Sequence, residues 1–277
     1  MRNQYKAVLI ACALAGCSDG SAPYSVSFAP LVNGMPFKCG ASYDNIGTTR
    51  TTIQPEDFRM YVHGVTLIRA NGEMHPLVLD QDKKWQLQDI ALLDFEDGTG
   101  LCNTASPETN TTVVGRAPQH SDYVGVQFTL GVQPTMDHLD AATASAPLNQ
   151  PALWWSWSGG YRYLRLDVQS TKNATWNFHL GAEFCTGANN TSITCKFDNQ
   201  STVTLMGFTP GKSSVAIDLT ALYANSDLDH QVDGVTEFVP GCMSDPMNDQ
   251  CPPLFGRIGL QFESAMPGPA QSVFVVQ

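Results

Sequence analysis

The chain has 277 residues, ordinary hydrophobic content (43%), few charged residues (15%) and a net charge of −11. An acidic chain lacks the basic surface that nucleic-acid binding requires, so we expect no nucleic-acid partner. A cation is an electrostatically compatible ligand.

Residues 1–17, "MRNQYKAVLIACALAGC", have the pattern of an export signal, with Arg2 and Lys6 before a short apolar run. The run is too short to span a bilayer as a helix. Its end, Leu-Ala-Gly-Cys, predicts a lipobox in which Cys17 is lipidated. An ordinary cleaved signal, or a buried helix with a chance cysteine, is the alternative. We therefore expect a bacterial lipoprotein exported to the periplasmic side of a membrane or to the outer membrane, and held there by its N-terminal lipid.

About 260 residues follow the signal, with 13 basic and 26 acidic side chains and a net charge of −13. We predict a tether over residues 18–25 and one domain over residues 26–277. Cys12 leaves with the signal, and an even number of cysteines in an exported chain favours disulfides over metal. Six cysteines allow fifteen pairings. The local loops favour Cys185–Cys195 and Cys242–Cys251, which would leave Cys39 with Cys102.

Short alternating segments predict strands along the whole domain. Tyr24, Val26 and Phe28 share one face of the first, and Asn71-Gly72 is a hairpin signal between two apolar runs. Further strands are expected within residues 122–132, 161–170, 175–181, 201–208, 213–222 and 271–277; residues 55–62 and 218–227 could each hold a helical turn or two. The pattern predicts an all-β protein, an antiparallel β-sandwich or barrel-like single domain with long disulfide-closed loops.

Motifs of common enzymes are missing from the predicted domain, which contains neither HExxH nor GxSxG. We therefore expect a protein that is not an enzyme. "DLDHQVDG" at 227–234 suggests a calcium loop but lacks the glutamate at the twelfth position, so a loose calcium site is a weak expectation there.

The segment "PALWWSWSGGYRY", residues 151–163, concentrates Trp154, Trp155 and Trp157. In a strand, Trp155 and Trp157 would share one face. Three interpretations are open: a packed core, a platform on which sugar rings stack, and an element for oxidation–reduction chemistry. Spacing alone does not choose among them.

Two of the six histidines lie in suggestive places. His138 is in the polar segment "MDHLDAATASAPLN" shortly before the tryptophans, and His179 is in "TWNFHLG", where it would share a strand face with Asn177. Without a metal-ligand spacing, the simpler interpretation of each is a hydrogen-bonded or exposed side chain.

Several motifs occur in a distinctive order: "VNGMPFKCG", "LLDFEDGTGLC", "GVQFTLGVQPTMDHLDAATASAPLN", "LWWSWSGGYRYLRLD", "FHLG…C" and "GCMS…C". Together they resemble the MbnP family, the four-Cys partner of a metallo-mystery pair. The resemblance runs from about Phe28 to Cys251, so residues 26–277 are expected to form an MbnP-like β domain.

The resemblance implies an exported protein that binds one copper ion. Its partner would be a MauG-like dihaem enzyme of the MbnH type, which oxidises a tryptophan to kynurenine. The family's WxW element is similar to Trp155-Ser156-Trp157, and Trp157 ranks ahead of Trp155 as the modified residue.

By the same resemblance, His138 and His179 are the expected copper ligands, with Asp137 and Asp140 behind them. Imidazole suits copper in both oxidation states. Two departures stand out: Leu153 replaces a methionine expected before the WxW element, and Asp137 replaces an asparagine. The alternative function is a surface lipoprotein with an aromatic carbohydrate-binding platform and no metal.

Overall fold

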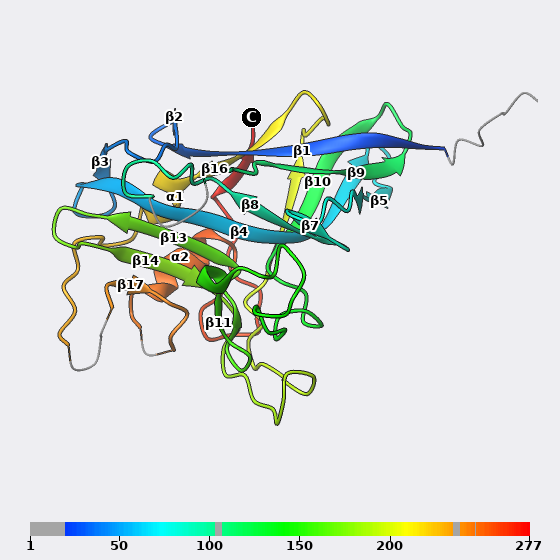
Figure 1. The fold of residues 1–277 in the computed structure, drawn as a ribbon. Coiled ribbons are helices and arrows are strands. Elements are labelled where there is room, and N and C mark those ends of the chain that lie inside the picture. Colours follow the sequence, from blue (N-terminus) through cyan, green and yellow to red (C-terminus); the bar gives the residue numbers. More distant parts are fainter. Residues whose placement is uncertain (1–19, 103–106, 235–238, 247) are drawn as a thin grey trace, which may run out of the picture.

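The computed structural model describes residues 20–102, 107–234, 239–246 and 248–277 (Figure 1). The predicted signal peptide and Cys17 lie outside the described residues. Within the described ranges, no helix has the length and apolar character needed to cross a membrane.

Two packed sheets form a β-sandwich, which confirms the predicted fold class (Figure 1). The six-stranded sheet has the order β18-β16-β1-β9-β6, with β2 paired to β1. Its strands are β1 (Ser21–Val32), β2 (Met35–Pro36), β6 (Val78–Leu79), β9 (Thr112–Pro118), β16 (Ser214–Asp218) and β18 (Phe274–Val276). All its pairs are antiparallel except β1 with β16.

The ten-stranded sheet has the order β15-β10-β4-β13-β14-β17, and the 19-residue strand β4 (Thr51–Arg69) is its spine. The others are β3 (Tyr43–Ile46), β5 (Met74–Pro76), β7 (Gln86–Leu87), β8 (Ile90–Asp94), β10 (Tyr123–Leu130), β13 (Leu164–Gln169), β14 (Trp176–Leu180), β15 (Ser201–Met206) and β17 (Gly241–Cys242). Only β14 and β17 pair in parallel. The expected hairpin turn is present, because β4 pairs with β5 and Gly72 has a φ of +86°.

The core lies between the sheets, and alternation along the strands fills it. Phe28 of β1 and Phe274 of β18 each meet Phe128 of β10 edge-on, with ring centroids 5.2 and 5.4 Å apart. Val26 and Phe28 are buried, as their predicted shared face requires. Aromatic contacts of this kind add to the free energy gained from apolar burial.

Helices are few and short: the 3₁₀ turn η1 (Pro151–Leu153), α1 (Leu219–Tyr223) and α2 (Cys251–Arg257). The helical turn expected in residues 218–227 is therefore present, and Asp218 caps it by accepting a hydrogen bond from Ala221 N. The turn expected in residues 55–62 is wrong, because these residues lie in β4. Pro55 is tolerated there because the register with β13 shifts beside it.

The predicted tether is too long. Residues from Ser21 onward already belong to β1 and pair with β9, beginning at Ser21 opposite Pro118. Residues 21–25 are therefore part of the sandwich, because their backbone hydrogen bonds are satisfied by the neighbouring strand.

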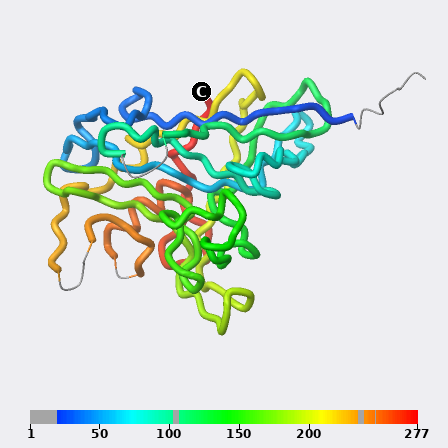
Figure 2. Tube along the Cα trace, viewed as in Figure 1, coloured from blue at the N-terminus to red at the C-terminus, as the bar shows by residue number. Residues whose placement is uncertain are grey.

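Three disulfides join the six cysteines of the domain in the pairing favoured by the local loops: Cys39–Cys102, Cys185–Cys195 and Cys242–Cys251. The loops between β10 and β13, together with the loop closed by Cys185–Cys195, extend from one side of the molecule, toward the bottom of Figure 2. The WxW element lies in this end, in the small hairpin of β11 (Trp154–Ser156) and β12 (Gly160–Tyr161).

Candidate metal centre

His179 is held in a buried strand by a carboxylate. The register aligns His179 of β14 with Arg165 of β13, and Asp167 is two residues further along β13. His179 Nε2 lies 2.7 Å from Asp167 Oδ1, and both side chains are almost fully buried. Burial raises the pKa of Asp167, but its hydrogen bonds with His179 and Arg165 and the charge of Arg165 together bring it below its ordinary value, so this carboxyl is ionised.

An ionised Asp167 only accepts, so the proton of the imidazole sits on Nε2. Burial lowers the pKa of His179, which keeps the ring neutral. Nδ1 then carries a lone pair, and it is buried with no hydrogen-bond partner among the described residues. A carboxylate behind one ring nitrogen and a free lone pair on the other is the arrangement found behind metal-binding histidines.

Asp167 is fixed by a row of buried charges across β13 and β4. Its Oδ2 accepts from Arg165 Nε at 2.7 Å, and the same Nε lies 3.1 Å from Asp57 Oδ2. Asp57 also accepts from Arg59, whose Nε lies 3.0 Å from Glu96. Such networks lose several kcal/mol when one partner is removed, so the orientation of Asp167 and of His179 is rigidly set.

Trp155 packs against Gly181, which follows His179 by two residues. A Cβ added at Gly181 would lie 2.3 Å from Cζ3 of the Trp155 ring, so the indole edge rests on the bare backbone of that glycine. Gly181 follows His179 by two residues along an extended chain, which places them on the same side. The Arg162 guanidinium lies 5.2 Å from the Trp155 ring centroid and also lowers the pKa of His179 by its charge, though burial is the larger cause.

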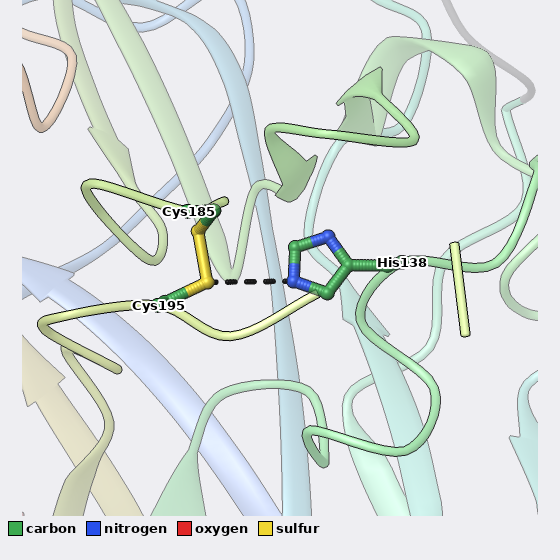
Figure 3. Close-up of side chains that lie close together, drawn as sticks. All are labelled: His138, Cys185 and Cys195. Atoms are coloured by element: carbon green, nitrogen blue, oxygen red, sulfur yellow. Dashed lines mark hydrogen bonds between the residues drawn. A yellow bond between two sulfur atoms is a disulfide. The ribbon is translucent and has the colours of Figure 1, made fainter. Parts of the chain in front are cut away.

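Trp157 is coupled to His138 through its backbone. His138 Nδ1 lies 3.0 Å from the carbonyl oxygen of Trp157, and because a carbonyl only accepts, Nδ1 carries the proton. Burial lowers the pKa of His138, so its Nε2 bears a lone pair. That nitrogen faces Cys195 Sγ at 3.4 Å (Figure 3). The side chain of Trp157 is 43% exposed, whereas Trp154 and Trp155 are partly buried.

Asp137 lies beside His138, as expected, but it orients the hairpin. Its Oδ2 is 3.5 Å from His138 Nε2, and the carboxyl accepts from Tyr161 N at 2.9 Å and from Tyr163 Oη at 2.8 Å. Burial raises the pKa of Asp137 to about 7. The carboxyl packs directly against Gly160, where any Cβ would come within 2.7 Å of it. This close approach explains the glycine after the tryptophans.

Asp140 has a local role. Its Oδ1 accepts from Ala142 N at 2.9 Å, within a turn. Among the described residues, no hydrogen bond joins Asp140 to His138 or His179. The ring of His138 is instead oriented by the carbonyl of Trp157.

Asp229, in the segment that suggested calcium, is saturated by protein donors. Its Oδ1 accepts from Thr51 and Ser170, both at 3.0 Å, and its Oδ2 accepts from Thr49 at 3.1 Å. This carboxylate ties three loops together. In the part of the chain that the structure describes, the group of side chains with metal-ligating spacing is His138, Cys185 and Cys195, so the structure gives the calcium expectation no support.

The structure thus places Trp155 against Gly181, two residues after His179, and joins His138 to the backbone of Trp157. Sequence reasoning missed Asp167 and Gly181, and it predicted the disulfide Cys185–Cys195 but not its place beside His138. Asp167 is one of the polar residues that alternate with apolar ones in "LRLDVQ", but only the register of β13 with β14 shows that it faces His179.

A search of protein families matches residues 21–244 to MbnP. Among solved structures, the fold is similar to that of MbnP from Methylosinus trichosporium, with 30% sequence identity and a TM-score of 0.81. That match covers 92% of this chain and 98% of the other. None of the curated proteins matches the chain.

Proposed function

Because this chain belongs to the MbnP family, we propose that it is an exported copper-binding protein, anchored through lipidated Cys17 and not itself an enzyme. A dihaem enzyme of the MbnH type is its partner and oxidises one tryptophan of the WxW element to kynurenine. Two equivalents of hydrogen peroxide supply the two oxygen atoms that open the pyrrole ring between C2 and C3, with water as by-product. Hydrolysis then releases the formyl carbon as formate.

The contacts of the WxW element with the segments that carry both imidazoles support this proposal. Trp155 packs against Gly181, two residues after His179, and the carbonyl of Trp157 accepts a hydrogen bond from His138. Opening either indole replaces a poor ligand with an aniline nitrogen and a ketone oxygen. A donor would thereby appear next to an imidazole that is already oriented.

Trp157 is the better substrate of the two. Its 43% exposure leaves the indole accessible to an enzyme, while Trp155 is partly buried, with Gly181 against its ring edge and Arg162 near the ring. Ring opening needs room for added oxygen atoms, which the solvent side of Trp157 provides.

The donor set fits copper. His179 offers a buried, unpartnered Nδ1 held by Asp167, and His138 Nε2 borders a pocket of about 270 Å³. Copper is at the top of the divalent affinity order for imidazole and oxygen donors, and when bound it would supply a one-electron redox centre. The chain's own part is to keep both imidazoles neutral and fixed in direction.

The carbohydrate platform has less support. Sugar rings stack on exposed aromatic faces, and of the three clustered tryptophans only Trp157 is exposed. Trp155 presents its ring to Arg162 and Gly181.

Copper stoichiometry after co-expression with the partner enzyme tests the function. We expect one tightly bound copper ion per oxidised chain and none at the same affinity in unmodified protein. The His138→Ala/His179→Ala double variant should lose this copper, while His63→Ala, a control imidazole bonded to Gln200, should keep it. Full retention by the double variant would refute the ligand assignment.

Asp167→Asn tests the positioning of His179. Outer partners of ligating histidines contribute about 10- to 100-fold in metal affinity, so we expect a loss of that size with an unchanged kynurenine content. Lipidation is tested separately by labelling with radioactive palmitate, which should fail in Cys17→Ser.

A further inference from the structure

The disulfide Cys185–Cys195 lies against the lone pair of His138. Cys195 Sγ is 3.4 Å from Nε2, and one ligand atom from each of the three residues lies within 4.8 Å of the others (Figure 3). His138 is buried and its direction is fixed by the carbonyl of Trp157. The imidazole therefore presents an unprotonated nitrogen to sulfur. The copper site proposed above uses the same Nε2 of His138 but neither sulfur atom, so the two sites would share this one ligand.

Backbone hydrogen bonds hold the two cysteines opposite each other without help from the sulfur–sulfur bond. On one side, Thr186 and Thr194 exchange two hydrogen bonds, of 2.9 and 3.0 Å. On the other, Glu183 donates to Phe197 at 2.9 Å and accepts from Lys196 at 3.1 Å. A reduced hairpin would keep both thiols beside His138.

This disulfide is also the most accessible of the three. Cys185 and Cys195 are partly buried, whereas the four other cysteines of the domain are at most 7% exposed. Exposed disulfides react first in thiol exchange, because the attacking thiolate must reach a sulfur atom.

We propose that Cys185, Cys195 and His138 form a redox-gated site for one Cu(I) ion, closed while the disulfide is intact and opened by its reduction. A dithiol reductant transfers two electrons to the sulfur–sulfur bond, which becomes two thiols while the reductant becomes a disulfide. Binding of Cu(I) then displaces two protons and forms two copper–sulfur bonds and one copper–nitrogen bond. The copper stays Cu(I) throughout.

The donor set suits Cu(I). Thiolates are soft ligands that favour Cu(I), which is stable with few ligands, whereas zinc on three protein ligands needs a bound water as its fourth. In the described ranges the group contains three. The site goes beyond the proposed function, because it needs neither kynurenine nor His179.

Thiol mapping is the first test. The full mature protein is treated with a limiting dithiol under anaerobic conditions, alkylated and digested. We expect label on Cys185 and Cys195 before any on Cys242 or Cys251. Preferential reduction of Cys242–Cys251 or of Cys39–Cys102 would overturn the proposal.

A Cu(I) competition titration with bicinchoninate is the second test, after removal of the reductant. The reduced protein should take one Cu(I) from the probe and show thiolate-to-copper ultraviolet absorption, and the oxidised protein should do neither. Cys185→Ser/Cys195→Ser should behave as the oxidised protein, with its fold checked by circular dichroism. His138→Ala should weaken binding about tenfold or more, and His138→Asn serves if that variant misfolds. Equal affinity in oxidised and reduced protein would overturn the site.

Two variants separate this site from the proposed function. Trp155→Phe/Trp157→Phe cannot form kynurenine yet should keep full Cu(I) binding when reduced, and so should His179→Ala. Loss of Cu(I) in His179→Ala, with thiols intact, would contradict the three-residue site and leave the kynurenine proposal standing.

Discussion

The two imidazoles beside the WxW element are held in opposite ways. His179 is in a central strand, with a carboxylate behind it and a network of buried charges behind that carboxylate. His138 is in a loop, oriented by one carbonyl and facing a disulfide. In a strand, the pairing with the neighbouring strand fixes the side chains that contact a ligand such as His179. In a loop, a ligand such as His138 can lie beside a group that chemistry can change, here a disulfide.

Removal of Asp167, on the strand side with His179, should cause the largest loss of unfolding free energy. Asp167→Ala leaves His179 Nε2 buried without its partner and leaves Arg165 with Asp57 alone, which costs about 3–5 kcal/mol of unfolding free energy. Urea denaturation measures it. Asp140→Ala is the control on the loop side, where one turn hydrogen bond is lost and about 1 kcal/mol or less is expected. Equal losses would mean that the two sides are equally rigid.

On the loop side, with His138, the stability of the fold should depend on pH through Asp137. Burial raises its pKa to about 7 in the folded protein, so the folded state binds this proton more tightly than the unfolded chain does. Its contribution to stability is therefore present at low pH and lost as the pH rises toward 7. Relative to Asp137→Asn, the wild type should lose roughly 2–3 kcal/mol between pH 4.5 and 7, measured by denaturation at each pH. Parallel curves for the two proteins would contradict this ionisation.

Gly181→Ala should push Trp155 away from His179. The added methyl would lie 2.3 Å from the ring, so overpacking of about 1–3 kcal/mol is expected, with a shift in tryptophan fluorescence. Gly256→Ala is the matched control, because its Cβ would meet only Pro269 at 3.8 Å. An unshifted spectrum in Gly181→Ala would show that Trp155 does not depend on this contact.

Trp157→Phe should have the smallest effect on stability. With 43% of its surface exposed, its replacement is expected to change the unfolding free energy by about 0.5 kcal/mol or less. The same change should abolish oxidation at this position. A loss as large as that of Gly181→Ala would identify Trp157 as a packing residue.

Much of the fold could be predicted from local patterns. Alternation located the first strand's buried face at Val26 and Phe28, Asn71-Gly72 marked a real hairpin, and short loops favoured the observed disulfides. The middle of β4 could not be predicted in this way. Asp57 and Arg59 look like residues of a polar turn. They are tolerated in a buried strand because they pair with each other, Asp57 also meets Arg165 of β13, and Arg59 also meets Glu96.

Only part of the candidate site could be predicted from the sequence. His138, His179 and the tryptophans followed from the order of motifs, but what each imidazole contacts did not. Asp167, the carbonyl of Trp157 and the sulfur of Cys195 reach the rings through strand register and loop packing, which no local pattern encodes. Asp137 was expected to orient His138. It does lie beside His138, but its carboxyl accepts a hydrogen bond from Tyr161 N.

Peptide mass spectrometry across residues 151–163 tests the central claim most directly, on protein expressed with and without the dihaem enzyme. The account predicts a kynurenine mass shift at Trp157, or at Trp155 beside it, only when the enzyme is present. Unmodified tryptophan in both samples, with an enzyme shown to be active toward peroxide, would contradict it and leave the cluster as packing around His138 and His179.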